Sequence, residues 1–546
     1  MPVETNASSQ SMEGMAKLEP LALPSLPFLP AGVGPLQLKP SDLVGRTQLR
    51  TSSYTIYVDL PGNPDDMLLV HGYTGAHDLV SKRVATYLRS KESRFAPKPL
   101  YGDWTPEPAI EGEVPQPSDQ TLEVLQRRGY LVTLTPEEEE ALFVKLASEH
   151  HLSSLRRVPS YVLMPTYQCN LRCPYCFQDH MRTKAEYSHL LKVMDRTMAD
   201  RILQGMRNIE AAHGYPDASD ITRSLTLFGG EPLLARSRPL IQYFLEQMKA
   251  RGKVRVSAIT NATELDAYED LLTPDGIFSL QVTVDGPPRE HDRRRIYADG
   301  SGSFERIARN LTMALDRGVS VSVRLNLDRN NLQLLPEMAE EFQARGWMGR
   351  RNFMPYAAAL NASNENVSPK SVFNSWQLGQ ALQELRQQHP LVSQIALTDD
   401  TIQLRARQIF DKQATSKGFN TAFCGAHTTM YVIDSFGDLY ACWERTGDPR
   451  VRIGHIDAAG DVFMNRQLMQ LWRGRNVVSN PVCRKCRYAT SCGGGCAVLA
   501  EGASGVLYKN FCDGYAQRFR ANVAKAYLSH LSGEKLGPTV ERLCET

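Results

Sequence analysis

Eleven cysteines are distributed very unevenly along the chain. Three lie between Cys169 and Cys176, none lies between Cys176 and Cys424, seven lie between Cys424 and Cys512, and Cys544 stands alone near the end. In a reducing compartment, clustered cysteines are more often metal ligands than disulfide partners. The distribution therefore predicts two metal-binding regions separated by a cysteine-free body.

The overall charge does not point to a charged partner. Lys and Arg number 62 against 60 Asp and Glu, a formal net charge of +2, so we expect neither nucleic acid nor a membrane as a partner. No apolar run approaches the ~20 residues of a membrane-spanning helix. The first residues also lack the cationic start and apolar stretch of a secretory signal. We expect a cytoplasmic protein, and the 546 residues predict about three domains.

From Tyr161 onward, strand-like and helix-like segments alternate. Six apolar segments with amphipathic helices between them are predicted strands, at residues 161–165, 224–228, 253–259, 279–284, 321–327 and 351–356. Near-continuously apolar strands that alternate with helices are typical of a parallel sheet covered by helices. The span of roughly 200 residues is short of the ~250 of a closed eight-fold barrel. The sequence therefore predicts an α/β fold, with a partial (β/α)6 TIM-like barrel over residues 155–357.

Smaller units flank the predicted barrel. Residues 1–50 are rich in Pro, Ser and Leu without any period, which is typical of a disordered or draping tail. In residues 51–152, two strands precede helices, one of them with Thr135 as N-cap and Pro136 in its first position. This order predicts a winged-helix-like module. The remaining predicted units are a helical bridge (358–420), a C-terminal cysteine-rich iron–sulfur domain of hairpins and loops (421–515), and a last helix and tail (516–546).

The first three cysteines, Cys169, Cys173 and Cys176, have the spacing Cys-x3-Cys-x2-Cys in the loop that leaves the first predicted barrel strand. Three thiolates on a short loop can bind three corners of a 4Fe–4S cluster and leave the fourth iron without a protein ligand. A cofactor or substrate needs such an open metal position. A zinc site with His180 as the fourth ligand is the alternative.

This loop resembles the signature of the radical-SAM superfamily, in which an aromatic residue, here Tyr175, precedes the last cysteine. The resemblance implies that the open iron chelates S-adenosylmethionine through its amino and carboxylate groups. It also implies that an electron from the cluster releases a 5′-deoxyadenosyl radical, which abstracts hydrogen. Gly229, Gly230 and Glu231 end the second strand as Gly-Gly-Glu-Pro, a segment that the family places at the methionine amine.

Two further positions match cofactor contacts of the peptide-modifying members of this family. In those members a hydroxyl or small polar residue meets the ribose, and an arginine twelve positions later meets the carboxylate; the matching residues are Thr283 and Arg295. A guanidinium suits a carboxylate because it offers paired donors. The alternative is that Arg293, Arg294 and Arg295 form a solvated basic run. The sequence indicates no catalytic acid or base.

The second cysteine group resembles the SPASM domain, the auxiliary-cluster module of maturases of sulfatases, quinone cofactors and ribosomal peptides. The resemblance implies two further 4Fe–4S clusters, three in all, held by Cys483, Cys486, Cys492 and Cys512 and by Cys424, Cys442 and Cys496. The second of these sets is one ligand short, and an open iron, His427 or Cys544 could complete it. Zinc ribbons use two Cys-x2-Cys pairs, and only one such pair is present.

The likeness to maturases implies a ribosomally made peptide or protein as substrate, and an electron donor such as flavodoxin or ferredoxin. Modules like the one predicted at residues 51–152 bind leader peptides as an added strand, although a plain capping domain fits the same pattern. Sulfatase maturases have Asp directly after the cysteine of Gly-x4-Cys, where this chain has Trp443 and then Glu444. We therefore expect a peptide maturase. A sulfatase-type or quinone-cofactor maturase, or an iron–sulfur electron-transfer or partner-binding protein, is the alternative.

Overall fold

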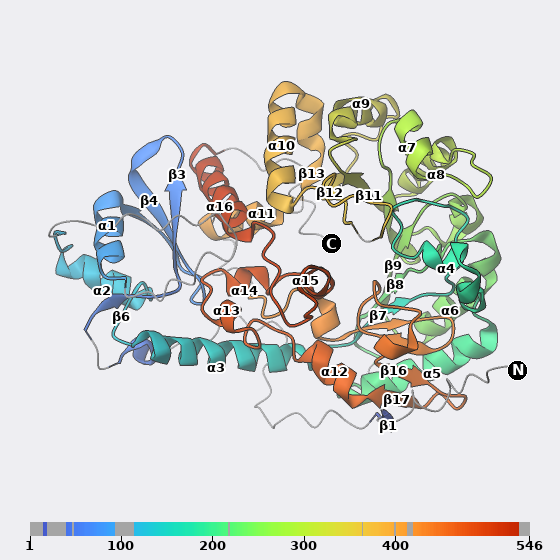
Figure 1. Cartoon of the computed structure of the whole chain (residues 1–546), viewed down its shortest axis with the longest axis horizontal. Coiled ribbons are helices and arrows are strands. Elements are labelled where there is room, and N and C mark those ends of the chain that lie inside the picture. Colours follow the sequence, from blue (N-terminus) through green and yellow to red (C-terminus); the bar gives the residue numbers. More distant parts are fainter. Residues whose placement is uncertain are drawn as a thin grey trace, which may run out of the picture.

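Three regions of the chain lie side by side in the computed structural model (Figure 1). The N-terminal module lies at one end, the parallel sheet with its helices lies at the other, and the cysteine-rich helices lie between them. The structure describes residues 15–18, 40–45, 48–92, 114–216, 219–362, 364–397, 400–411 and 419–533. None of the helices in these ranges has the length and apolar character needed to cross a membrane.

Six parallel strands pair in the order in which they occur in the chain, which confirms the predicted α/β fold and parallel sheet. They are β7 (Ser160–Leu163), β8 (Arg223–Leu227), β9 (Val254–Thr260), β10 (Ile277–Thr283), β11 (Ser320–Leu327) and β12 (Phe353–Ala359). The short β13 (Ala396–Leu397) adds to β12 in parallel. Because all strands run the same way, their carboxyl ends meet at one edge of the sheet.

Helices cover one face of this sheet. They are α5 (Arg196–Ala212), α6 (Arg238–Ala250), α8 (Phe304–Asp316) and α9 (Leu335–Ala344), whereas the short α7 (Pro288–Arg294) begins just after β10 at the strand ends. Strand residues such as Leu225, Val256 and Leu280 are fully buried in the core that these helices share with the sheet. The alternate residues, such as Ser257 and Gln281, are only half-buried. The face of the sheet that the helices cover is therefore more deeply buried than the opposite face.

The cysteine-rich region continues the same sheet, which the sequence did not predict. Its strand β14 (Met430–Ile433) pairs in parallel with β7. An antiparallel meander follows, made of β15 (Asp438–Tyr440), β16 (Gly454–Ile456) and β17 (Val462–Asn465). At the far edge β1 (Met15–Lys17) pairs with β17. This part of the predicted tail is thus an edge strand; most of residues 1–50 lies outside the described residues.

The N-terminal module is a small antiparallel sheet with helices. Its sheet consists of β3 (Thr55–Leu60), β4 (Asn63–His71) and β5 (His77–Ser81), and β2 (Arg50–Thr51) pairs separately with β6 (Leu131–Val132). Its helices are α1 (Lys82–Ser90), α2 (Asp119–Arg127) and α3 (Pro136–Ser154). The N-cap role of Thr135 is confirmed, as part of a capping box. Strand β5 was not predicted, and it pairs with β4 on the side opposite β3.

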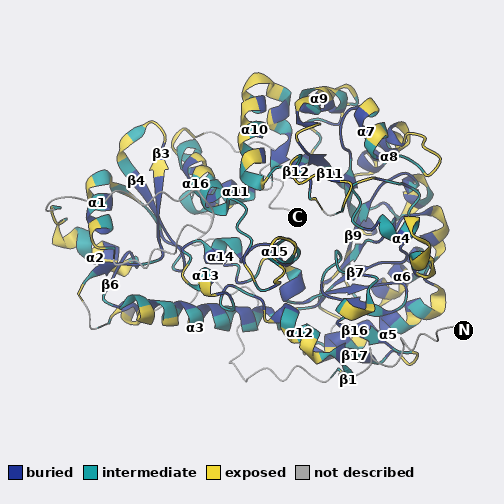
Figure 2. Cartoon of the chain, viewed as in Figure 1, coloured by how far each residue is buried: buried dark blue, intermediate teal, exposed yellow. Residues whose placement is uncertain are grey.

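The remaining helices lie outside the module and outside the helical layer of the sheet. They are α4 (His180–Thr183), α10 (Ser375–Gln388), α11 (Asp400–Phe410), α12 (Arg466–Arg473), α13 (Pro481–Arg484), α14 (Ala489–Cys492), α15 (Ala497–Ser504) and α16 (Tyr515–Leu531). Short 3-10 turns lie at Pro40–Leu43, Ala185–Leu190, Ala235–Ser237, Leu265–Leu271, Leu332–Leu334, Pro390–Gln394, Gly425–His427 and Pro449–Val451. Figure 2 shows buried residues along the central strands and exposed residues on the outward faces of α3 and α10.

The module packs directly on the segment that carries four of the cysteines. Tyr54 and Phe143 of the module share an apolar cluster with Cys483. Thr490 Oγ1 donates to the carbonyl oxygen of Gly72 at the end of β4. The module therefore contacts the cysteine-rich region through its core and not only through a linker.

Candidate active site and cysteine centres

The loop after β7, residues 166–178, carries three cysteines to the carboxyl ends of the strands; we call it the cysteine loop. Two backbone bonds join it to the residues after β8: Gly230 N donates to Thr166 O (3.0 Å) and Glu231 N donates to Gln168 O (2.7 Å). A Cβ at Gly230 would overlap backbone oxygens of the loop. Glycine is therefore needed for this close approach.

Polar donors surround two of the sulfurs. Arg182 Nη2 donates to Cys176 Sγ (3.0 Å), and Leu171 N donates to Cys169 Sγ (3.4 Å), beside Asn261 Nδ2 at 3.7 Å. Among the described residues, Nε and Nη1 of Arg182 are buried and have no hydrogen-bond partner. A buried cation with unused donors beside three thiols fits an anionic iron–sulfur cluster.

The thiols themselves are held in a medium that disfavours their charged form. Burial raises the pKa of Cys173 to about 12 and outweighs the opposing effect of Arg295. Burial likewise raises the pKa of Cys169, against the effect of Arg182. Because metal ligation requires the thiolate, a bound cluster would supply the positive charge that the thiolates need.

The zinc alternative finds no support in the geometry. The ring of His180 packs edge-on against Tyr187, with ring centroids 4.9 Å apart. In the described ranges, no three His, Cys, Asp or Glu side chains converge on a position for a single metal ion. A 4Fe–4S cluster does not require such convergence, since each thiolate binds its own iron.

Glu231 is buried and bonded to its neighbours. Its carboxylate accepts hydrogen bonds from Leu233 N (2.9 Å), Thr260 Oγ1 (2.6 Å) and Asn261 N (2.6 Å). Burial raises its pKa to about 7, although these donors oppose the rise. The carboxylate therefore ties the end of β8 to the end of β9, a role that the sequence did not predict.

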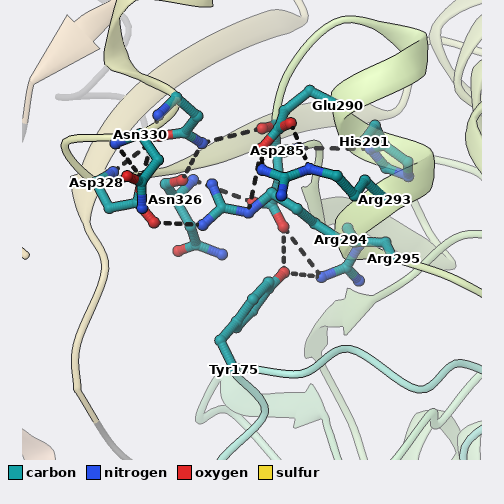
Figure 3. A network of polar contacts seen from close by, with 11 residues as sticks. Tyr175, Asp285, Glu290, His291, Arg293, Arg294, Arg295, Asn326, Asp328 and Asn330 are labelled. Atoms are coloured by element: carbon teal, nitrogen blue, oxygen red, sulfur yellow. Dashed lines mark hydrogen bonds and ion pairs between the residues drawn. The ribbon is translucent and has the colours of Figure 1, made fainter. Parts of the chain in front are cut away.

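The three consecutive arginines after β10 have different environments (Figure 3). The side chain of Arg293 is 68% exposed and pairs with Glu290. Arg294 pairs with Asp328 (2.7 Å). Arg295, only 10% exposed, donates through Nη1 to the hydroxyl of Tyr175 (2.6 Å). Of the three arginines, only Arg293 is exposed as a solvated basic run would require. The structure brings Tyr175 and Arg295 together.

Thr283 lies at the carboxyl end of β10, in register with Arg324 of β11. It belongs to the half-buried face of the sheet.

The segment after Cys442 also reaches the carboxyl edge of the parallel sheet. The ring of Trp443 lies 5.8 Å from that of Phe228, which precedes Gly229.

Four cysteines of the C-terminal region form one group. Burial, together with the nearby thiols of Cys512 and Cys486, raises the pKa of Cys492 to about 12. Burial also raises the pKa of Cys483, as do these same three thiols. Asn510 Nδ2 donates to Cys512 Sγ (3.2 Å). The fold thus brings together the four residues that the resemblance assigns to one cluster.

Cys424, Cys442 and Cys496 form a second group. Burial raises the pKa of Cys442, and the thiols of Cys424 and Cys496 add to the rise. His427, a candidate fourth ligand, is fully buried with Nδ1 at 2.9 Å from the carbonyl oxygen of Trp472. Its other ring nitrogen faces Arg475. The ring therefore points to these neighbours, and Cys544 lies outside the described residues. No disulfide joins the ten cysteines of the described ranges.

Arg475 is buried between the two groups and was missed by the sequence analysis. It donates to the carbonyl oxygens of Leu507 (2.7 Å), Gly495 (2.9 Å) and Lys509 (2.8 Å). Burial lowers its pKa, while thiols of both groups, including Cys483 and Cys424, oppose that change. Asp285 and Arg182 were also missed. No sequence signal marks these residues, because only the tertiary fold brings them to the cysteines.

The site combines three thiols at the carboxyl edge of a parallel sheet with buried cations and a glycine contact from the next strand. These are features of a radical SAM domain, and residues 163–341 match the family model of the Radical SAM superfamily. The chain therefore contains a radical SAM domain over these residues, and S-adenosylmethionine is the cofactor of such a domain.

The matches to individual relatives cover between about one third and about two thirds of the chain. It is 22% identical over 376 residues to the cysteine-type anaerobic sulfatase-maturating enzyme of Clostridium perfringens (strain 13 / Type A), covering 64% of this chain and 92% of the relative. A probable GTP 3′,8-cyclase of Archaeoglobus fulgidus is 26% identical over 172 residues, which cover 32% of this chain and 49% of the relative. The solved structure of native anSMEcpe with bound AdoMet and Kp18Cys peptide has a TM-score of 0.50 at 14% identity, covering 69% of this chain and 99% of that one.

Proposed function

We propose that this enzyme uses the radical derived from S-adenosylmethionine to modify a side chain of a ribosomally made peptide or protein. The observation that carries the proposal is the contact of Trp443 with Phe228, which brings the segment of Cys442 to the strand ends beside the glycine contact. A cysteine centre close to the proposed cofactor site suits an enzyme that exchanges electrons with its substrate. The substrate would be held between the cysteine centre and the cofactor.

In this proposal, each residue at the strand ends contacts a particular part of the cofactor. When bound at the open iron of the first cluster, S-adenosylmethionine supplies a 5′-deoxyadenosyl radical for hydrogen abstraction. Gly229, Gly230 and Glu231 lie at its amine, Thr283 bonds its ribose, and Arg295 bonds its carboxylate. Tyr175, on the cysteine loop, contributes its aromatic ring to the cofactor-binding site.

Three 4Fe–4S clusters are the proposed metal content: one on the cysteine loop and two in the C-terminal groups. Loaded protein should contain about twelve iron atoms. An electron donor such as flavodoxin or ferredoxin would reduce them. The reduced thiols fit the cytoplasm as the proposed location.

Replacement of Cys173 by Ala tests the first cluster. The variant should form no 5′-deoxyadenosine under dithionite and retain about eight of twelve iron atoms, because the other two groups keep all their ligands. The measurements are anaerobic product analysis and iron content of the reconstituted protein. Undiminished 5′-deoxyadenosine formation would refute the assignment, as would a zinc-loaded, iron-free protein with full activity.

The N-terminal module is the proposed recognition element for a leader peptide. Strand β5 is an edge of its sheet, and Leu79 on that strand is 43% exposed. An exposed edge with an apolar side chain is a template for an added peptide strand. The peptide-bound state of the anSMEcpe structure supports a peptide as the substrate class.

Replacement of Leu79 by Asp tests this recognition. The variant should need at least about tenfold more leader-bearing peptide for half-maximal modification, a change of ~1.4 kcal/mol. The matched control is Val124→Asp, which alters an apolar residue of α2 that is 38% exposed and lies off the sheet edge. Equal KM values for both variants and the natural chain would contradict leader recognition at β5 and favour a plain capping domain.

Sulfatase maturation is the second candidate function, favoured by the relative from Clostridium perfringens. Trp443 stands where sulfatase maturases have an Asp. Incubation with a peptide that carries a sulfatase-type cysteine or serine distinguishes the two candidates. Conversion of that residue to an aldehyde would establish the second.

A further inference from the structure

Asp285 is fully buried where the cysteine loop, β10, β11 and α7 meet (Figure 3). Its Oδ2 accepts a hydrogen bond from the Tyr175 hydroxyl, and its Oδ1 accepts one from Asn326 N (3.3 Å). The backbone of Asp285 is held as well, since Asn331 Nδ2 donates to its carbonyl oxygen (3.1 Å). The carboxylate therefore has a fixed position and a fixed set of donors.

The Tyr175 hydroxyl connects this carboxylate to Arg295. Arg295 Nη1 donates to the hydroxyl (2.6 Å) and lies 3.9 Å from Asp285 Oδ2. A guanidinium only donates and a carboxylate only accepts, so the hydroxyl must accept from Arg295 and donate to Asp285. Removal of either end of this chain would leave a buried group unsatisfied.

Arg295 keeps a donor that none of these contacts uses. Its Nε is buried and has no hydrogen-bond partner among the residues that the structure describes. The backbone of Arg295 is fixed too, because Ser303 Oγ donates to its carbonyl oxygen (2.6 Å). A guanidinium anchored at Nη1 with a free Nε is prepared to donate to one more acceptor.

We infer that Asp285 is a positioning residue for S-adenosylmethionine: through the Tyr175 hydroxyl it fixes the Arg295 guanidinium for the carboxylate of the cofactor. The inference rests on the proposed contact between Arg295 and that carboxylate. It adds a connection between the cysteine loop and the cofactor pocket, because the same hydroxyl belongs to the loop that holds the first cluster. Asp285 does not touch the cofactor in this arrangement.

Binding of S-adenosylmethionine to cluster-loaded full-length protein tests the inference. Asp285→Asn and Tyr175→Phe should each raise the dissociation constant about tenfold or more. The double variant should be little weaker than either single variant, because both changes break the same chain. The electron paramagnetic resonance spectrum of the reduced first cluster without cofactor should stay unchanged in both. A merely structural loss would alter that spectrum.

Two further variants separate this inference from the proposed function. Glu290→Gln changes a carboxylate on α7 that pairs with Arg293, and the cofactor affinity should stay within about twofold of the natural value. Arg295→Lys should weaken cofactor binding, since it removes the planar donor fork. If Arg295→Lys weakens binding and both Asp285→Asn and Tyr175→Phe do not, the positioning role is wrong and the carboxylate contact stands. If none of the three weakens binding, the carboxylate contact itself is wrong. Should Asp285→Asn fail to load its cluster, Tyr175→Phe alone decides.

Discussion

Buried arginines determine the electrostatics of the cysteine centres at the scale of single residues. Arg182 donates to Cys176 Sγ, and Arg475 lies between the two C-terminal groups. A fixed positive charge beside a cluster stabilises its more negative, reduced state. These side chains are therefore expected to set how easily each cluster accepts an electron.

Arg182→Gln should lower the reduction potential of the first cluster. The variant removes a buried positive charge and a donor to sulfur, and the shift should amount to tens of millivolts, since about 59 mV is a tenfold change in a one-electron equilibrium. A redox titration followed by electron paramagnetic resonance measures it. The control is Lys184→Gln, which removes an exposed and solvent-screened charge two residues away. Equal shifts in both variants would contradict the role of Arg182.

At the scale of elements, the contact between the module and the cysteine-rich region depends on close backbone approach. A Cβ at Gly72, the residue after β4, would overlap the carbonyl oxygen of Arg487. Tyr54 donates its hydroxyl proton to the carbonyl oxygen of Arg484 in the same segment. The loop between Cys483 and Cys492 is thus braced by the module from one side.

Gly72→Ala should reduce the iron content of the protein. The added methyl group pushes the module away from the loop that carries the four-cysteine group, so this cluster should bind less firmly and up to about four iron atoms per chain should be lost. Iron analysis after anaerobic reconstitution measures the effect. Gly502→Ala in α15 is the matched control, because a Cβ there meets nothing within 4 Å. A full complement of iron in Gly72→Ala would show that the contact does not support the cluster.

Local signals explain which elements the sequence could predict. The capping box of Thr135 and the six parallel strands follow from short-range patterns of caps and apolar runs. The pairing of β14 with β7 joins residues far apart in the chain, and no local pattern encodes it. The two C-terminal cysteine groups could be proposed from the resemblance to the SPASM domain. The roles of Asp285 and Arg182 could not, because they depend on where separate elements meet.

At the scale of the whole molecule, the regions are held together by shared cores. Helix α16 packs on β3 through Phe519, Val523 and Ala524. Helix α5 ends beside β14, where His213 Nε2 lies 2.9 Å from the Tyr431 hydroxyl. Loss of one region would therefore expose apolar surface of the next.

The contact at His213 makes stability sensitive to acid. Burial, helped by Arg473, lowers the pKa of His213 to about 4, so the folded state favours the neutral ring. Its stabilisation is present above the ordinary pKa of about 6.5 and is lost as the pH falls toward 4.

Thermal unfolding of the natural chain and of His213→Gln at pH 7 and pH 5 measures this effect. The natural chain should lose about 2 kcal/mol more between these pH values than the variant, which has no ring to titrate. Other buried histidines contribute equally to both proteins and cancel in the comparison. Parallel loss of stability in the two proteins would assign the acid sensitivity elsewhere.

The pairing of β7 with β14 also has a consequence for the order of events on the ribosome. Ser160 and Met430 are partners in the sheet, and Tyr167 of the cysteine loop donates to Asp434 just after β14 (2.9 Å). Chains emerge from the N-terminus onward, so the loop is synthesised long before the strand that closes its side. The first three cysteines therefore leave the ribosome before the C-terminal strand that packs beside their loop has been made.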